Sequence, residues 1–267
     1  MAVYTSAISP PRMVTMAARK FIAKLIVAAA SALLAHSVSA ETLFGIYAGA
    51  GTWHQNSEGH LQSNGTEVDT SQDMGLGDDD GNVIAVAFEH PIPFVPNVRV
   101  QQAKVGMRGG IEIERDVVLA GVSFIPPGTV DSTLDLEMTD AILYYRVLDD
   151  ALSLDLGLEA RKLKGSASIS GGIYHAEVEF DGTIPMLYAA VEWELLSGFW
   201  MSANAQAITW KGDSFLDYSG ALGWNSDLGL GLEVGYRYFR LKLDELGDIE
   251  KANLIIDGPF AALNYRF

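Results

Sequence analysis

Strict alternation of apolar and small or polar residues constrains this chain more than any other feature. From Leu228 to Tyr238 every second residue is apolar, and the residues between are Gly, Glu or Arg. The same period recurs at 152–159 and 187–195, and it dominates the chain from residue 43 onward. A period of two predicts β-strands. In a soluble sandwich the apolar face would meet a second sheet, whereas in a transmembrane barrel it would meet lipid, and alternation alone leaves both possible.

The two ends of the sequence favour the barrel. Leu263, Tyr265 and Phe267 share one face of the final strand, a pattern typical of the closing strand of an outer-membrane barrel, and we interpret them as an assembly signal. Near the start, a basic region precedes the apolar run 21–34 and the small-x-small site 38–40. We therefore expect residues 1–40 to be a signal peptide cleaved after Ala40, with 41–267 forming the barrel. The apolar run is too short for a membrane-spanning helix.

Alternation and turn residues predict an antiparallel, up-and-down transmembrane β-barrel of about ten strands, with eight or twelve as alternatives. Residues 117–124 could be strand or loop. Short connectors rich in Pro, Asp, Gly and Ser should lie at one end, with mostly longer loops at the other. Such asymmetry predicts short turns in the periplasm and long loops outside the cell. The expected strands are roughly 43–53, 81–90, 97–112, 132–147, 151–165, 178–195, 199–211, 215–225, 228–243 and 252–267.

The tryptophans and the charged residues of the strands give more specific expectations. Tryptophans near strand ends are typical of aromatic girdles at the two membrane interfaces, and we assign Trp53, Trp193, Trp200, Trp210 and Trp224 to them. Charged residues on the other face of the strands should line the lumen, where they would form either a salt-bridged plug or, less favoured, a small cation-preferring pore. These lumen-lining candidates are Glu89, Asp155, Glu159, Arg161, Glu192, Glu194, Glu233 and Arg237.

Composition excludes several classes of function. The formal net charge is −16, which argues against nucleic acid as a partner because phosphate binding needs Lys and Arg. There is no cysteine, so disulfides, thiolate zinc sites and cysteine catalysis are excluded. The acidic run 77–82 does not fit an EF-hand, because Leu76 and Ala87 would occupy its first and twelfth positions. A solvated turn is the favoured interpretation of that run, with a surface divalent cation as the alternative. We expect no cofactor and no protein-bound metal.

Catalysis is the minor alternative. His54, His60 and His175 fall in expected loops, close to acidic residues, and could serve a lipid-directed enzyme at the barrel rim. No serine with an identifiable nucleophile context accompanies them. The proline-rich turn at 88–97 is expected to stiffen a periplasmic connection, with a docking motif as the alternative.

Several segments resemble a family of Gram-negative outer-membrane β-barrel proteins without assigned function. The resemblance rests on residues 43–53, 89–93, 153–158, 185–188, 241–244 and the strand beginning Gly258-Pro259. It implies insertion into the outer membrane by the barrel assembly machinery, with outer-membrane lipid and lipopolysaccharide as surroundings, and it supplies no catalytic or ligand residues. The sequence thus predicts a non-enzymatic outer-membrane protein, structural or a narrow passage for small solutes.

Overall fold

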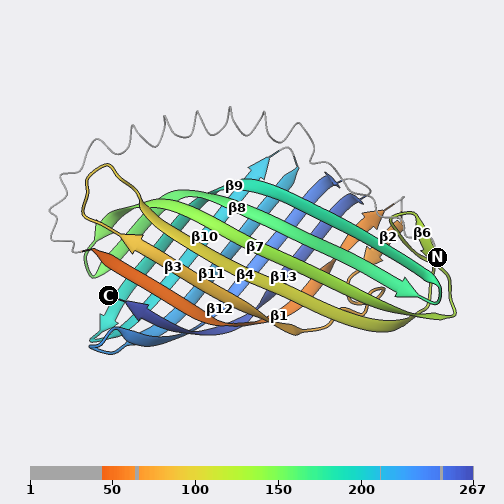
Figure 1. Cartoon of the computed structure of the whole chain (residues 1–267), viewed down its shortest axis with the longest axis horizontal. Helices are drawn as coiled ribbons and strands as arrows, with labels where there is room; N and C mark the ends of the chain where they lie inside the picture. The colour runs from red at the N-terminus through yellow and green to blue at the C-terminus, as the bar shows by residue number, and fades with distance from the viewer. Residues whose placement is uncertain (1–43, 64–65, 211, 247–248, 267) are drawn as a thin grey trace.

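In the computed structural model, ten long strands close into a barrel (Figure 1). The structure describes residues 44–63, 66–210, 212–246 and 249–266. The expected signal peptide 1–40 and Phe267 lie outside these residues. Among the described residues, no helix is long and apolar enough to cross a membrane.

Each long strand pairs antiparallel with the next, and β13 pairs with β1 to close the ring. The predicted ten-stranded barrel is therefore confirmed. The short β2 (Thr66–Asp69) pairs with the end of β1, and β5 (Val117–Leu119) pairs with β6 (Val122–Phe124) in a separate hairpin. The ten barrel strands are β1 (Gly45–Ser63), β3 (Asp79–Glu89), β4 (Asn97–Ile113), β7 (Gly128–Asp149), β8 (Leu152–Gly171), β9 (Tyr174–Leu196), β10 (Phe199–Trp210), β11 (Asp213–Asn225), β12 (Leu230–Leu246) and β13 (Ile249–Arg266).

Several strands are longer than the alternation predicted. Residues 166–177 were expected to be a loop, but β8 and β9 stay paired as far as Gly171 and Tyr174. Similarly, β1 continues to Ser63, although its expected end was residue 53. These strands run on past the region where their apolar residues face outward. Beyond that region the apolar residues face the interior and the polar residues face outward. For this reason the sequence pattern did not reveal that the strands continue.

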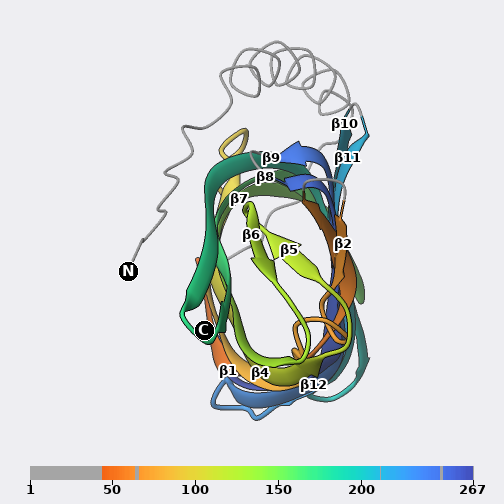
Figure 2. The same ribbon diagram turned by 90° about the vertical axis from the view of Figure 1, so that its right-hand side faces the viewer.

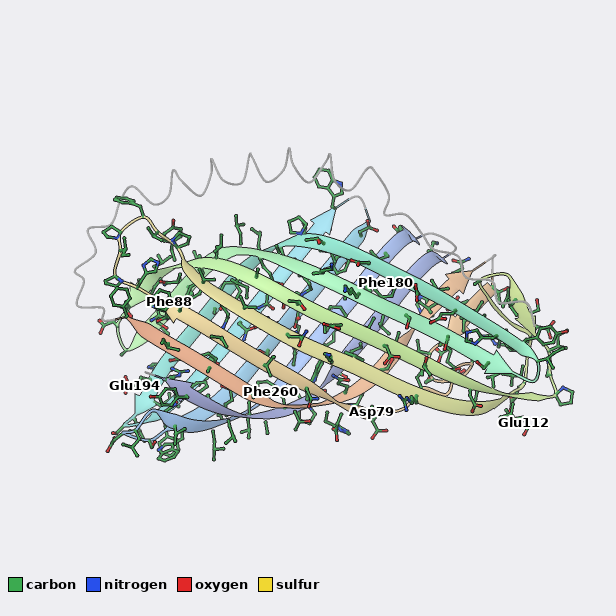
Figure 3. The ribbon with its side chains drawn as sticks, in the orientation of Figure 1. Asp79, Phe88, Glu112, Phe180, Glu194 and Phe260 are labelled. Carbon is green, nitrogen blue, oxygen red and sulfur yellow. The ribbon has the colours of Figure 1, made fainter. Side chains whose placement is uncertain are left out.

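At one end, which we call the belt half, the barrel is apolar outside and polar inside. This end carries the connectors 90–96, 150–151, 197–198 and 226–229, which we call the short connectors. The expectation of mostly longer loops at the other end is wrong, because β8 ends at Gly171 and β9 begins at Tyr174, and β10 ends at Trp210 and β11 begins at Asp213; the long connections there follow β1 and β4. On β8 the outward residues from 152 to 160 are Leu or Ala, close to the nine to eleven residues with which a tilted strand crosses a bilayer. Large apolar side chains are exposed all around this half, and Figure 3 labels one of them, Phe88. They include Val86, Val100, Leu143, Leu156, Leu187, Leu222, Val234 and Leu263.

At the other end, which we call the distal half, the sides are reversed. On β12, Leu232 and Val234 face outward in the belt half, but farther along the strand Phe239 and Leu241 are buried inside and Arg240 faces outward. Charges of alternating sign lie side by side on the outer face across four strands, in the order Lys104, Glu137, Lys164 and Asp181. An apolar inside and a charged outside are what a barrel surrounded by water requires.

Two inserted segments complete the apolar interior of the distal half. The β5–β6 hairpin lies across the distal opening, within the ring of strands (Figure 2). Its Leu119 is fully buried, as is Met74 of the inner segment, which comprises residues 70–76. The inner segment packs against Gly109 of β4, where an added Cβ would come within 2.1 Å of the carbonyl oxygen of Gly75. Any larger residue at position 109 would therefore require the backbone of the inner segment or of β4 to shift.

Asp69 holds the start of the inner segment. Its carboxylate accepts hydrogen bonds from the backbone N–H of Ser71 and Gln72, at 2.9 and 2.8 Å. At the same segment, Arg115 forms an ion pair with Asp73, which ties the loop after β4 to the inner segment. Burial raises the pKa of the Asp69 carboxyl, but the hydrogen bonds from Gln72 and Ser71 outweigh it, and the net pKa is lowered.

We expect this turn to loosen in acid. A carboxyl group whose pKa is lower in the folded protein than in the unfolded chain stabilises the folded state at pH values above its unfolded pKa of about 3.9. This stabilisation is lost as the pH falls through the pKa of the folded state. The protection factors of the amides in the inner segment, which compare the observed exchange rate with the intrinsic rate at the same pH, should therefore fall below about pH 4. The fall should be smaller in Asp69→Asn, whose amide oxygen accepts these bonds at every pH. An equal fall in both proteins would show that Asp69 is not the titrating group.

Candidate functional site

A layer of buried charges separates the two halves of the barrel interior. Arg161 on β8 donates to both carboxylate oxygens of Asp140, at 2.7 and 2.9 Å. It also lies 2.7 Å from Asp217, which accepts two hydrogen bonds from Arg237 at 2.9 and 2.6 Å. Glu159 completes the layer, 3.1 Å from Arg161. We call these five residues the charged layer.

Aromatic rings cover the two arginines of the charged layer. The Arg237 guanidinium lies 4.8 Å from the ring centre of Trp53, and that of Arg161 lies 5.9 Å from Phe239. Such cation–π contacts suit a guanidinium that is shielded from water. Trp53, Phe239 and all five residues of the charged layer are buried, so this level of the interior is shielded from water; we call it the partition.

Below this partition, the belt half contains a polar cavity of about 370 Å³. Trp53, Asp217 and Arg237 border its inner end, where they are buried. At the other end its lining includes Asp150 and Glu194, which are exposed beside the short connectors. The cavity is therefore closed toward the distal half and open at the short-connector end.

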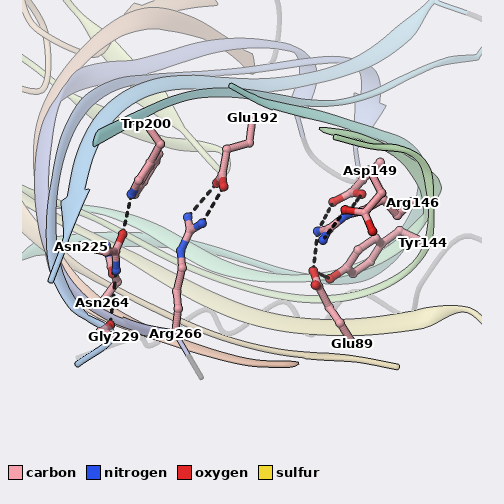
Figure 4. Close-up of polar contacts among 11 residues, drawn as sticks. Glu89, Tyr144, Arg146, Asp149, Glu192, Trp200, Asn225, Gly229, Asn264 and Arg266 are labelled. Atoms are coloured by element: carbon pink, nitrogen blue, oxygen red, sulfur yellow. Dashed lines mark hydrogen bonds and ion pairs between the residues drawn. The ribbon is translucent and has the colours of Figure 1, made fainter. Parts of the chain in front are cut away.

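Ion pairs hold the wall of the cavity together (Figure 4). Arg146 reaches Glu89 at 2.6 Å and Asp155 at 3.0 Å. On the opposite wall, both terminal nitrogens of Arg266 donate to Glu192, at 2.6 and 2.7 Å. The Arg146–Asp155 pair links the neighbouring strands β7 and β8, whereas Arg146–Glu89 joins β7 to β3 and Arg266–Glu192 joins β13 to β9, strands that are not neighbours in the sheet.

The structure places all eight lumen-lining candidates on the inside of the belt half. Glu89, Asp155, Glu192, Glu194, Glu233 and Arg237 line the cavity, and Glu159 and Arg161 belong to the charged layer. Their main partners were missed by the sequence reasoning. Alternation would have found some of them, because successive residues of a strand point to opposite faces. If Val98 and Leu143 face outward, the residues next to them on β4 and β7 must face the interior. The missed residues are Tyr47, Arg99, Asp140, Tyr144, Arg146, Tyr188, Asp217 and Arg266.

The expected aromatic girdle needs a correction. Trp53 and Trp200 face the interior, where they are 0% and 6% exposed, so neither can contact lipid. Each lies an even number of residues from inward residues of its own strand and must therefore face inward. The distance of a tryptophan from the strand end, on which the prediction was based, does not show this. Trp193 and Trp224 are exposed near the short connectors, and Trp210, also exposed, ends β10.

The three histidines of the catalytic alternative lie apart. His54, on the outer face of β1, is 2.9 Å from Asp80 and 3.6 Å from Asp78. His60 lies 3.9 Å from Glu67. At the tip of the β8–β9 hairpin, the ring of His175 contacts the hydroxyl of Ser170 at 2.8 Å and the carboxylate of Glu177 at 3.6 Å. The structure therefore does not bring the three together into one site.

The acidic run at 77–82 enters β3, and Asp79 and Asp80 are exposed there. Within the residues that the structure describes, no group of three or more His, Asp or Glu side chains is arranged to hold a metal ion. Leu263 and Tyr265, which we interpret from the sequence as part of an assembly signal, are exposed on the outer face of β13.

Comparison with known proteins finds similarity in fold. No family model and no curated protein matches the chain. Similar solved structures include the outer membrane protease OmpT from Escherichia coli, at 11% identity, a TM-score of 0.49, and coverage of 85% of this chain and 99% of that one. The transport unit of the autotransporter AIDA-I from E. coli has 11% identity, a TM-score of 0.42, and coverage of 92% and 97%. Ail of Yersinia pestis has 15% identity, a TM-score of 0.32, and coverage of 85% and 100%.

Proposed function

We propose that this protein is a closed, non-enzymatic barrel of the Gram-negative outer membrane. The observation that carries the proposal is the polarity of the barrel, which is apolar outside only in the belt half and carries charge outside in the distal half. A belt of this height suits a bilayer, and a charged outer face suits water. The short connectors then face the periplasm and the distal half projects from the cell. Lipid and lipopolysaccharide are the expected surroundings of the belt, with the barrel assembly machinery as the partner for insertion.

A closed lumen fits the interior better than a passage for solutes does. A solute entering the cavity from the short-connector end would meet the charged layer first. Behind that layer lies the apolar core, to which Leu136, Leu163 and Phe215 contribute from the strands and Leu119 from the β5–β6 hairpin. Passage would therefore need the buried charges to separate and the core to open, and both changes are costly.

Conductance in planar bilayers tests the closed lumen. The purified protein should give no stable single-channel steps at any voltage that the bilayer tolerates. Heat-modifiable gel mobility and fractionation with the outer membrane should confirm that the sample is a folded barrel in the expected compartment. Reproducible ion-selective steps from such a sample would replace the closed barrel with a pore.

A lipid-directed enzyme is the competing function, and the histidine positions disfavour it. On β9, His175 stands twelve residues from the lipid-facing Leu187, or roughly 40 Å along the strand at ~3.3 Å per residue. Of the three histidines, only His54 lies near the boundary between the belt half and the distal half. We expect the triple variant H54A/H60A/H175A to leave the lipid composition of the envelope unchanged. An altered acylation pattern in cells expressing the variant would contradict the non-enzymatic proposal.

A further inference from the structure

One arginine in the belt half differs from its neighbours in what it binds. Five arginines project into this half, and four of them form ion pairs with carboxylates, namely Arg146, Arg161, Arg237 and Arg266. The fifth, Arg99 on β4, lines the cavity. Among the described residues, no carboxylate lies within ion-pair distance, 4.0 Å, of its guanidinium. Glu233 is near enough to act on Arg99 only through longer-range electrostatics.

Two tyrosines hold the Arg99 guanidinium in place. One terminal nitrogen donates to the hydroxyl of Tyr188 at 3.2 Å. The ring of Tyr47 lies 5.1 Å from the guanidinium carbon and is also contacted by Arg266, at 5.6 Å. The side-chain Nε of Arg99 is shielded from bulk water and has no hydrogen-bond partner. The group is thus oriented by aromatic residues, while the edge formed by Nε and the second terminal nitrogen has no partner among the described residues.

The neighbouring arginines show what fits that edge. Arg161 binds Asp140 through Nε and Nη2, at 2.7 and 2.9 Å, and Arg237 binds Asp217 through the same two nitrogens, at 2.9 and 2.6 Å. Arg146 uses them on Asp155, at 3.0 and 3.4 Å. A planar guanidinium edge matches a carboxylate with two parallel hydrogen bonds. Arg99 is the inward arginine of this set whose matching carboxylate the chain does not supply.

We propose that the cavity binds a small organic carboxylate, with Arg99 as the residue that receives it. The ligand enters at the short-connector end, which is the periplasmic end in the orientation proposed above. Its carboxylate takes the Nε–Nη2 edge of Arg99, and Tyr47, Tyr144 and Tyr188 offer ring surface to its body. A cavity of about 370 Å³ admits a molecule the size of benzoate. The Arg99 guanidinium is half-buried and has no carboxylate within ion-pair distance, so a bound anion adds a charge-assisted interaction that the chain itself does not make.

The acidic residues of the cavity do not favour a cation in its place. Glu89, Asp149 and Asp155 pair with Arg146, Glu192 with Arg266, and Asp217 with the charged layer. Each of these paired acids would have to give up an arginine before it could hold an ammonium group. Of the other acidic lining residues, Asp150 and Glu194 are exposed at the mouth of the cavity, and Glu233 acts on Arg99 and Arg266 through longer-range electrostatics. Arg99 can accept an anion without breaking any ion pair of the described residues.

Binding to the purified, folded full-length protein in lipid nanodiscs tests the proposal. Isothermal titration and the ¹⁵N–¹H signals of arginine Nε should both report saturable binding of sodium benzoate or acetate. Benzylamine, which has a similar ring and the opposite charge, should not bind. The variant Arg99→Met should weaken benzoate binding about tenfold or more, because it removes hydrogen bonds to a charged group. Arg99→Lys should also weaken it, because an ammonium lacks the two-pronged edge.

Arg108→Met is the matched control. Arg108 lies on the same strand, β4, but its side chain is exposed on the outer face of the distal half, so benzoate affinity should not change. Each variant is first shown to be folded by its heat-modifiable mobility. Absence of carboxylate binding, binding of benzylamine in its place, or undiminished benzoate affinity in folded Arg99→Met would each overturn the proposal. Conductance is a separate readout, so failure here leaves the closed barrel standing, and a conducting barrel could still bind benzoate.

Discussion

Leu156→Arg should destabilise the barrel by about 2–4 kcal/mol in a bilayer, the cost of an arginine on the lipid face near the midplane. Leu156 lies on the outer face of β8 in the belt half and is 44% exposed there, and its cross-strand neighbours Tyr145 and Ala189 carry no charge to pair with an arginine. The measurement is the urea midpoint of refolding into lipid vesicles, followed by gel mobility. The expected result is a clear shift of that midpoint to lower urea.

The same substitution ten residues along the same face provides the control. Ser166 also faces outward on β8, but it lies in the distal half, opposite Asp135 and Glu179 on the neighbouring strands. We expect Ser166→Arg to change the free energy of unfolding by less than about 1 kcal/mol, since exposed ion pairs contribute little. Equal shifts from Leu156→Arg and Ser166→Arg would contradict the division of the barrel into belt and distal halves.

Arg161→Met should cost about 3–5 kcal/mol, because it leaves buried carboxylates without their counter-ion. Arg161 is fully buried and serves Asp140, Glu159 and Asp217 together. Methionine nearly fills the space, so most of the loss comes from uncompensated charge and little from a cavity. The same refolding midpoint measures it. Arg240→Met, on the outer face of β12 in the distal half, should be close to neutral.

The double variant Arg161→Met/Asp140→Asn separates charge from packing. Removing the negative charge of Asp140 should recover part of the stability lost in Arg161→Met, so the two changes should be less than additive. Strictly additive losses would mean that the charged layer contributes through packing and that its ion pairs are not coupled.

The barrel itself was predictable because its belt half obeys a single rule. Where lipid surrounds the strands, every outward residue must be apolar. The alternation over residues 152–158 of β8 and over 228–238 therefore predicts both that these segments are strands and which of their faces points outward. The eight inward charges followed from the same parity. What alternation could not show is which charges meet, because Arg161 and Asp217 lie on strands that are distant in sequence and face each other across the lumen.

The distal half was harder to predict because the apolar and polar faces exchange along one strand. At residues 161–171 of β8 the alternation continues, but the apolar residues now face the interior and the polar residues face outward. Sequence reasoning took residues 166–171, the far part of this stretch, for a loop. The burial of the inner segment and of the β5–β6 hairpin was missed for another reason, although residues 117–124 had been left open as strand or loop. Both are short, and their burial depends on a space that exists only after the barrel has closed.

The exchange of faces also fixes how deep the protein sits. Sliding the barrel outward would carry the outermost apolar residues of the belt on β8, first Ala160 and then Leu158, into water. Sliding it inward would submerge Lys162 and Lys164, which follow on the same outer face. Both displacements are energetically unfavourable, so the outward residues of the strands set the depth of the barrel in the bilayer. The protein should therefore respond to a thicker or thinner bilayer by deforming the lipid around it, with little vertical movement of its own.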